Sequence, residues 1–344
     1  MSRTMRGLLV LSLLLLAACS PGGGASPLPA AVKPATSPAG TPTPSPAPSA
    51  EAHVTLEDAR RVLRVYLATD DVVRASGDLS FDLALARDGQ APFASTAFRS
   101  TSMRPPRYTW GEPRLLVPRL DRFPLWFAAV VERRGPGGEK RTAVMAFMKQ
   151  YTTSRWLLSF SSLLEPGAAP PKVALDAEGY ATPLPTRDDT VAISPHLMAP
   201  LHATIAEEGP GGFAASLIAA GPRTTGYFTQ RGEDKPTAKW FGFLDESIFA
   251  ATAYPIYALR TDDGGAVILY SLTRTTLRQA KMKHAQGLVP VPEDVRWAVG
   301  APVVATMLRL VETHQYVSQV SRTGAAEPAR VIGFDGAVTG VSQK

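Results

Sequence analysis

The stretch that decides the fold is 125–151, LWFAAVVERRGPGGEKRTAVMAFMKQY. Its two arms, 125–132 and 142–151, are rich in apolar residues that favour strands, and the turn GPGGE at 135–139 lies between them. Two such runs on either side of a glycine-rich turn predict an antiparallel hairpin. Further runs of the same texture lie at 114–118 and 155–162. We therefore predict a meander of antiparallel strands.

Helices are expected ahead of this meander. Thr55 supplies an N-cap hydroxyl, and Glu57 and Asp58 place acids in the first turn that follows. Apolar residues then recur at helical spacing to about Ala75, and a second helical piece is expected at 91–99. Helices followed by a run of strands indicate an α+β fold, with the helices packed on one face of the sheet.

The same order repeats in the second half of the chain, after a proline-rich connector at 166–190. Ser194 and Pro195 predict a helix start, and Pro200 is expected to kink that helix or to restart it. Strand texture then returns at 254–260, 266–276, 304–320 and 329–341. We therefore predict two tandem α+β domains, at 53–165 and 191–344.

The beginning of the chain has the pattern of an export signal. Arg3 and Arg6 precede the apolar run 8–16, which is too short to span a bilayer, and Leu-Ala-Ala-Cys follows. This sequence resembles the lipobox of bacterial lipoproteins. The resemblance implies cleavage after Ala18, a signal peptide at 1–18 and lipidation of Cys19. The mature protein is then expected on the extracytoplasmic side of the cell membrane, held by its lipid anchor.

A tether follows the cysteine. Residues 20–52 consist almost entirely of Pro, Ala, Ser, Thr and Gly, a composition that cannot bury enough apolar surface to fold. We therefore predict a disordered segment at 19–52 that includes the lipidated cysteine. In polyproline II conformation, at about 3.1 Å per residue, it spans roughly 100 Å at most.

Two resemblances follow from this organisation. Helices and then a curved antiparallel sheet, in each half, resemble the cone-like folds of the nuclear-transport-factor-two and ketosteroid-isomerase type. The lipobox, the tether, the two halves and the junction that contains LDAEGYAT at 175–182 resemble a family of uncharacterised actinobacterial lipoproteins. This second resemblance implies a fold and a location, and it carries no catalytic residue over to this chain.

Composition excludes several classes of function. The net charge of +6 is spread over 344 residues without a basic cluster interleaved with aromatics, so no nucleic-acid partner is expected. Cys19 is the only cysteine, so a metal site must use His, Asp and Glu. His196 and His202 are six residues apart, too far around a helix to share a metal. We find no phosphate-binding loop and no catalytic motif, and we expect neither a metal nor a cofactor.

Three residues remain as candidates for acid–base chemistry. Glu312 and His314 alternate onto the same face of a predicted strand as Tyr316, and they could form a polar dyad if that face lines a cavity. The alternative is a polar strand surface that faces solvent. Asp70, near the end of the first helix, is the other candidate, because its side chain could project into a cone.

One aromatic cluster is a candidate surface for a partner or ligand. Trp240, Phe241 and Phe243 follow the polar stretch 231–239, which places them where a pocket rim or a binding patch could lie. The alternative is that these side chains belong to a core, as most aromatic residues do.

Three functions remain open. In the first, this is a non-enzymatic, membrane-anchored lipoprotein that binds an envelope protein or a small apolar or envelope ligand. In the second, it is an isomerase-like or cyclase-like enzyme that uses a lone carboxylate or histidine in a cone pocket. In the third, it is a structural spacer in an envelope assembly. We favour the first function because the sequence holds no recognisable catalytic constellation.

Overall fold

A computed structural model describes residues 54–281 and 288–344 of the chain. The predicted signal peptide, Ala18, Cys19 and the tether lie outside the described residues, as does His284. Ala50–Lys344 form one compact unit, and that unit is described below.

The structure confirms the predicted N-terminal helix. Helix α1 (Leu56–Ser76) begins after Thr55, whose Oγ1 accepts a hydrogen bond from the backbone N of Asp58 at 3.0 Å. It ends at Gly77, whose φ of 74° lies in the left-handed region that glycine adopts without strain. Helix α3 (Gln90–Ser100) lies where the second helical piece was predicted, and the short helix α2 (Leu79–Leu85) between them was not predicted.

The predicted meander is also present. Strands β3 (Leu125–Arg134) and β4 (Lys140–Lys149) pair antiparallel, from Leu125 opposite Lys149 to Arg134 opposite Lys140. The backbone N of Gly135 donates to the carbonyl of Glu139 at 3.0 Å, which closes the hairpin turn. The remaining strands of this half are β1 (Thr109–Trp110), β2 (Arg114–Leu116) and β5 (Leu157–Leu164).

The second half also begins with helices and continues with strands, but α6 lies between strands β9 and β10. Its helices are α4 (Pro195–Glu208), α5 (Thr225–Trp240) and α6 (Arg296–Val299), with short 3₁₀ turns at Gly209–Gly211, Phe213–Ser216 and Glu293–Val295. Its strands are β6 (Phe243–Ala251), β7 (Tyr257–Arg260), β8 (Ala266–Ala280), β9 (Val289–Pro290), β10 (Val303–Val304), β11 (Met307–Val320) and β12 (Arg330–Gln343).

Helix α4 of this half was predicted and helix α5 was not. Helix α4 passes through Pro200 as a single element, whereas a restart was an option in the prediction. Helix α5 was missed altogether because it contains Gly226, Gly232 and Pro236, residues that disfavour a helix interior. Only Tyr227 and Ala238 of α5 are buried, so its sequence shows little helical periodicity.

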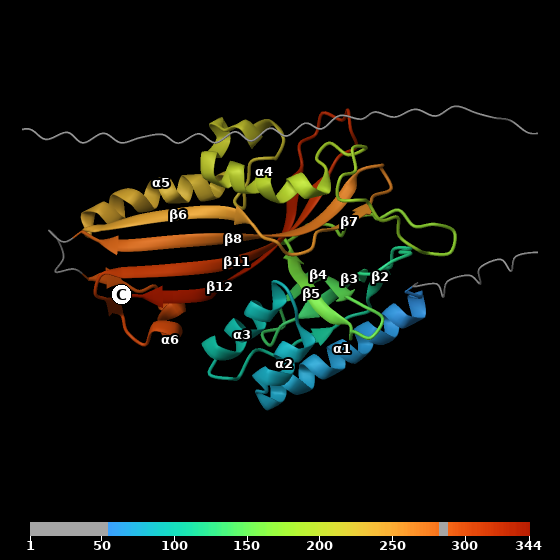
Figure 1. The fold of residues 1–344 in the computed structure, drawn as a ribbon, viewed down its shortest axis with the longest axis horizontal. Coiled ribbons are helices and arrows are strands. Elements are labelled where there is room, and N and C mark those ends of the chain that lie inside the picture. Colours follow the sequence, from blue (N-terminus) through green and yellow to red (C-terminus); the bar gives the residue numbers. More distant parts are fainter. Residues whose placement is uncertain (1–53, 282–287) are drawn as a thin grey trace, which may run out of the picture. The chain divides into compact units, whose positions relative to one another are not determined.

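The fold is α+β, as predicted, but its sheet is continuous. A ten-stranded sheet runs in the order β1-β3-β4-β5-β12-β11-β8-β6, with β2 beside β3 and β7 beside β8 (Figure 1). The equivalent last strands of the two halves, β5 and β12, pair antiparallel through Leu163–Phe334 and Leu164–Gly333. The two halves are therefore joined edge to edge.

A core shared by both halves explains why the division into two separate cone-like domains is not confirmed. One cluster of buried side chains takes Leu116, Val144 and Phe160 from the first half, and Tyr257 and Leu269 from the second. Trp126 also packs against Tyr257, with ring centroids 5.0 Å apart. Each half thus completes the hydrophobic core of the other.

Candidate functional site

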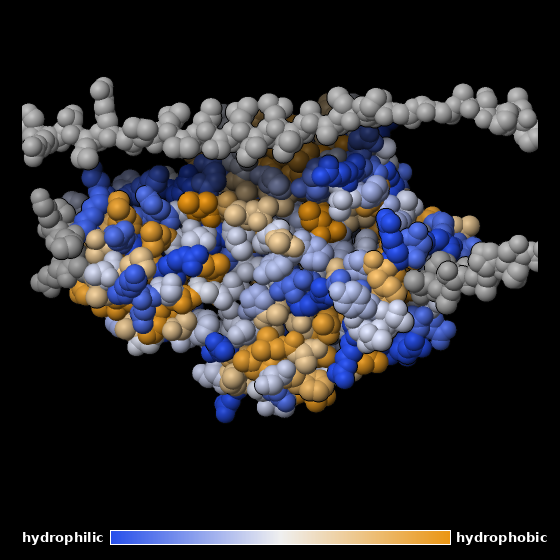
Figure 2. Space-filling model, in the orientation of Figure 1, coloured by the Kyte–Doolittle hydropathy of each residue, from blue (hydrophilic) through white to orange (hydrophobic). Residues whose placement is uncertain are grey.

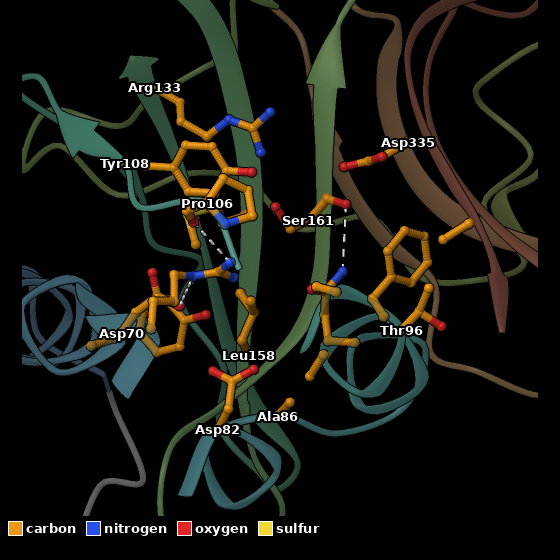
Figure 3. A pocket seen from close by; sticks show the side chains of 18 of the residues that line it. Asp70, Asp82, Ala86, Thr96, Pro106, Tyr108, Arg133, Leu158, Ser161 and Asp335 are labelled. Carbon is orange, nitrogen blue, oxygen red and sulfur yellow. Dashed lines mark hydrogen bonds and ion pairs between the residues drawn. The ribbon is translucent and has the colours of Figure 1, made fainter. Parts of the chain in front are cut away.

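The strongest candidate site is a cavity of about 380 Å³ between the three N-terminal helices and the sheet (Figure 3). Helices α1, α2 and α3 form one wall, strands β3, β4 and β5 form the floor, and the middle of β12 closes the cavity from the second half. Its charged lining residues are Asp70, Arg74, Asp82, Arg133 and Asp335. Its aromatic lining residues are Tyr66, Phe93, Tyr108 and Trp110.

Asp70, which the sequence singled out, lies in this cavity. Its carboxylate accepts a hydrogen bond from Arg74 Nε at 2.8 Å, one helical turn further along α1. Burial raises the pKa of Asp70, and the neighbouring guanidinium of Arg74 opposes that rise. Arg74 also donates to the carbonyl of Pro106 at 3.3 Å. The charge of Asp70 is therefore already neutralised within the protein.

Asp82 on α2 is different because its carboxylate has no hydrogen-bond or ion-pair partner in the described part of the chain. Its side chain points into the cavity (Figure 3), although the residue is only 4% exposed. Burial raises the pKa of Asp82 to about 6, with a smaller opposing effect from Arg74. Sequence reasoning missed this residue because α2 is too short for periodicity to reveal it.

Arg133 and Asp335 face the cavity from its opposite end. The guanidinium of Arg133 lies 4.2 Å from the ring centre of Tyr108, and no carboxylate of residues 54–281 or 288–344 lies within ion-pair distance of it. Burial raises the pKa of Asp335, while the positive charges of Arg133 and Arg141 lower it. The indole Nε1 of Trp110 is buried without a hydrogen-bond partner among the described residues.

Behind the cavity, a polar contact joins the two halves. Gln90 Nε2 of α3 donates a hydrogen bond to Gln315 Oε1 of β11. The same oxygen accepts from the backbone N of Ser161 at 2.9 Å, and Ser162 Oγ donates to the carbonyl of Gln315 at 3.2 Å. Because Gln315 is fully buried, these bonds satisfy polar groups that would otherwise be costly to bury.

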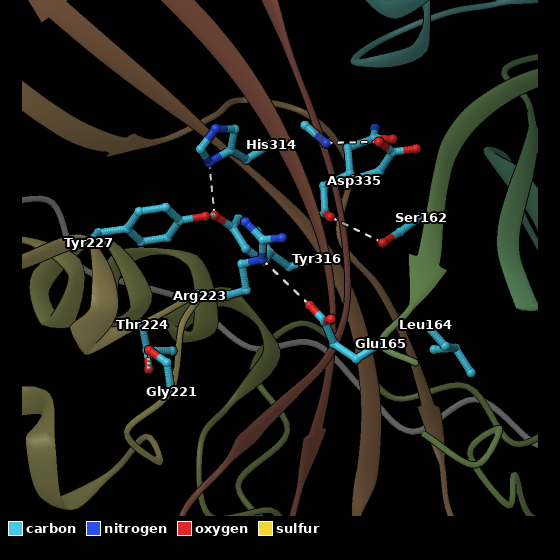
Figure 4. A network of polar contacts seen from close by, with 12 residues as sticks. Ser162, Leu164, Glu165, Gly221, Arg223, Thr224, Tyr227, His314, Tyr316 and Asp335 are labelled. Atoms are coloured by element: carbon cyan, nitrogen blue, oxygen red, sulfur yellow. Dashed lines mark hydrogen bonds and ion pairs between the residues drawn. The ribbon is translucent and has the colours of Figure 1, made fainter. Parts of the chain in front are cut away.

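The structure also brings Glu312 and His314 together, as their alternation predicted. His314 Nε2 lies 3.3 Å from a carboxylate oxygen of Glu312. Its Nδ1 lies 2.8 Å from the hydroxyl of Tyr316, a contact that Figure 4 shows. This face of β11 packs on helix α5 rather than facing solvent. His314 is 4% exposed and lies against the rings of Tyr227 and Phe249. Burial lowers the pKa of His314, and the carboxylate of Glu312 opposes that change.

The network around His314 extends through the second core. The hydroxyls of Tyr227 and Tyr316 lie 3.0 Å apart. His202 Nδ1 lies 2.7 Å from the hydroxyl of Tyr270, and its Nε2 lies 2.6 Å from the carbonyl of Arg223. Arg223 in turn forms an ion pair of 3.5 Å with Glu165 of the first half (Figure 4). Aromatic packing and these hydrogen bonds give the network a structural role, although Glu312 Oε2 is buried without a hydrogen-bond partner among the described residues.

The aromatic cluster of the second half is divided between surface and core. Trp240 is 86% exposed and Phe241 is 57% exposed, so both remain available to a partner. Phe243 is buried in a core cluster at the start of β6, which removes it from the candidate patch. A second apolar area lies over α1 and α2 in Figure 2, where Val72 of α1 and Phe81 and Leu83 of α2 are exposed.

Neither a metal site nor a membrane-spanning helix is found in the described part of the chain. Among residues 54–281 and 288–344, no three His, Cys, Asp or Glu side chains gather into a set that could hold a metal ion. None of the helices described there is both long enough and apolar enough to cross a bilayer.

Comparison with known proteins shows which family the chain belongs to. Residues 50–343 match a domain of unknown function, DUF8094. The chain belongs to this family. No solved structure matches the chain.

Three relatives of the chain are named as lipoproteins. An uncharacterized lipoprotein of Streptomyces avermitilis is 25% identical over 240 residues, which cover 67% of this chain and 68% of the relative. Lipoprotein SCO6871 of Streptomyces coelicolor is 29% identical over 245 residues, 68% of this chain and 64% of its own. Lipoprotein SCO2278 of the same species is 24% identical over 233 residues, 67% of this chain and 65% of its own. The matched part is thus less than two thirds of both S. coelicolor proteins.

Proposed function

We propose that this DUF8094 protein is a lipid-anchored protein of the cell envelope that binds a small polar ligand in the cavity under α1–α3. The observation that carries the proposal is the presence of charged groups, Asp82 and Arg133, on the cavity wall without ion-pair partners in the described residues. These unpaired charges argue for a polar rather than an apolar ligand, because buried charge is costly unless a partner compensates it.

The cavity indicates which groups such a ligand carries. Its volume of about 380 Å³ is within the usual range for small-molecule sites. An anionic group would pair with Arg133, and a cationic or donor group would pair with Asp82 and Asp335. An acceptor on the ligand would satisfy the buried Nε1 of Trp110. We therefore propose a dipolar ligand, such as an amino acid or a compound of similar size.

The proposed location of the protein is supported by observations other than those that support the ligand. The lipobox-like sequence that ends at Cys19 supports lipidation, and the named relatives are lipoproteins. We propose that the anchored protein faces the extracytoplasmic side and that the tether links it to the membrane. The shared strand order of the two halves supports our further proposal that each derives from one cone-like unit of the nuclear-transport-factor-two type.

The binding proposal is tested with three probes of similar shape and different charge. Phenylalanine is dipolar, phenylalaninamide is cationic and N-acetylphenylalanine is anionic. We expect phenylalanine to raise the melting temperature most, because binding to the folded state stabilises it. Arg133→Ala and Asp82→Asn should each reduce that shift. Arg60→Ala, on the exposed side of α1, is the matched control and should leave it unchanged. Equal shifts from all three probes, or none, would contradict the proposal.

A second candidate function follows from one property of Asp82. A buried carboxyl group whose pKa is about 6 can both donate and accept a proton near neutral pH, as an isomerase requires. If Asp82 performs catalysis, Asp82→Asn abolishes turnover of the bound molecule, whereas it only weakens the binding of that molecule. If the site only binds, the bound molecule is recovered unchanged by mass spectrometry.

The proposal also includes a surface that binds a partner protein. We propose that Trp240 and Phe241 contact an envelope protein, because exposed aromatic side chains are enriched at protein interfaces. A double variant, Trp240→Ser with Phe241→Ser, should lose partners that crosslink to the wild-type protein in membranes. Val303→Ser, which changes another exposed apolar side chain, is the control.

A further inference from the structure

Strand β12 has an edge that is mostly unpaired. It pairs with β11 from Gln319–Arg330 to Leu308–Gln343, almost its full length. On its other side it pairs with β5 only through Gly333 and Phe334. Beyond that point the two strands diverge, and within the described residues no strand lies beside β12 from Asp335 to Gln343.

A groove of about 620 Å³ runs beside this free edge. Helices α3 and α6 flank β12 on this side, and both lie near its lower edge in Figure 1. The groove is lined by Ser95, Thr96, Arg99, Met103, Trp297, Ala298 and residues 338–341. Thr96 also lines the first cavity, so it stands between the two sites.

The backbone of β12 turns hydrogen-bonding groups toward this side, and Thr96 already uses one of them. Thr96 Oγ1 donates a hydrogen bond to the carbonyl of Val338 at 2.9 Å, so that carbonyl points toward α3 and away from β11. A side chain here occupies a position that the amide of a neighbouring strand would take. Free strand edges present rows of such groups, and extended peptides bind to them by adding a strand.

The side chains of the groove indicate which peptide fits. Arg99 is exposed and has no carboxylate within ion-pair distance among residues 54–281 and 288–344. Trp297 is half-buried on the opposite wall and offers an apolar surface. The tether of this chain is a poor occupant, because its many prolines lack the N–H that strand pairing needs.

We propose that this groove binds an extended peptide that adds as a strand to β12 and places an acidic group on Arg99. This site is separate from the first cavity, and the proposal does not depend on the ligand proposed there. The two are tested with different probes, so either can fail alone.

The probe is a fluorescein-labelled Thr-Val-Thr-Val-Glu peptide, and anisotropy measures its binding to the full chain. One control peptide carries N-methyl groups on its valines, which removes backbone donors and keeps the side chains. A second control replaces Glu with Lys. At about 1.4 kcal/mol for each ion pair or hydrogen bond, we expect the Lys control to bind about tenfold more weakly and the N-methylated control, which lacks two donors, about a hundredfold more weakly.

Protein variants locate the site. Arg99→Glu should weaken the acidic probe about tenfold or more and improve binding of the Lys control, a reversal that a folding defect cannot produce. Arg60→Glu, another exposed helical arginine, should leave both peptides unchanged. Hydrogen exchange should slow at residues 338–343 when the probe binds, because a new strand protects the edge amides.

Several outcomes overturn the proposal. Equal binding of the N-methylated peptide excludes strand addition, and no binding at about 1 mM probe excludes even a weak site. A concentration-dependent dimer whose amides at 338–343 are protected without peptide would identify a second copy of the chain as the occupant instead.

Discussion

At the scale of single residues, Asp82 is a group whose charge the folded protein accommodates poorly. Its folded-state pKa of about 6 lies above the 3.8 of an unperturbed aspartate. The folded state therefore holds the proton more tightly, and the stability that this proton provides is present below pH 3.8 and is lost as the pH rises through 6. At neutral pH the ionised, buried carboxylate opposes folding.

Asp82→Asn should therefore stabilise the protein at neutral pH. We expect a gain of about 1–2 kcal/mol at pH 7.5, after allowance for solvent that reaches the cavity, and little gain at pH 4. Chemical denaturation at the two pH values measures it. Asp234→Asn, an exposed change on α5, is the control. A loss of stability at pH 7.5 would show that Asp82 has a partner that stabilises its charge.

His202 has the opposite dependence on pH. Burial lowers its pKa from 6.5 to about 4, so the folded state favours the neutral ring. The contribution of His202 to stability is complete above pH 6.5 and is lost as the pH falls toward 4, by at most about 3 kcal/mol.

His202→Phe should remove this part of the pH dependence. It should also lower the free energy of unfolding at pH 7 by about 2–4 kcal/mol, because the hydroxyl of Tyr270 and the carbonyl of Arg223 lose a buried partner. Unfolding curves from pH 4 to pH 7 measure both effects. His196→Gln, on the same helix but outside the buried network, should keep the wild-type slope. An unchanged slope in His202→Phe would contradict the assignment.

The sequence allowed some of these residues to be found and not others. Glu312 and His314 share a strand face because side chains alternate with a period of two, and that contact could be predicted. Asp335 could not be placed with Asp70, because the two come from different halves and meet only through the pairing of β5 with β12. No local pattern carries that information.

At the scale of elements, strand β6 forms one end of the sheet and has a protected edge. Glu207 of α4 accepts a hydrogen bond from the backbone N of Phe249 at 2.7 Å. Arg231 of α5 donates to the carbonyl of Ser247 at 2.9 Å and forms an ion pair with Glu207. This pair of side chains satisfies an outward donor and an outward acceptor, so it occupies positions that another chain would use.

Removing this cover should promote association. We expect Glu207→Ala with Arg231→Ala to form dimers or larger species at concentrations where the wild-type protein does not. Light scattering after size-exclusion chromatography measures the change. Glu233→Ala with Lys235→Ala, exposed on α5, is the charge-matched control. A double variant that keeps the wild-type mass distribution would show that the helices alone protect this edge.

Elements differ in how visible they are from sequence. Helix α1 has an N-cap, acids in its first turn and a terminal glycine, so its bounds were predicted closely. The β3–β4 hairpin has a glycine-rich turn between apolar runs. Helix α5 has none of these signals, and it forms because Tyr227 and Ala238 pack on the sheet beneath it. Tertiary packing here overrides local propensity.

At the scale of the whole molecule, the membrane anchor can be tested without reference to the fold. If Cys19 carries the lipid, Cys19→Ser should move the protein from the membrane fraction to the soluble fraction of the envelope, since the acyl chains supply the anchoring free energy. Ser20→Ala is the control. A Cys19→Ser protein that stays with the membrane would show that another segment holds it there.

The way in which the two halves are joined could not be predicted from the sequence. A repeated order of elements suggested two domains, but local patterns could not reveal that β5 and β12 would join or that one core would draw on both halves.

A half expressed alone exposes the apolar side chains of that shared cluster and one free strand edge. We therefore expect residues 53–165 and 191–344 to be unfolded or aggregated when separate, because burial of those side chains stabilises each half. The full chain should unfold in a single calorimetric transition, with equal calorimetric and van't Hoff enthalpies. Two well-resolved transitions, or a half that unfolds cooperatively by itself, would instead support independent modules that merely touch.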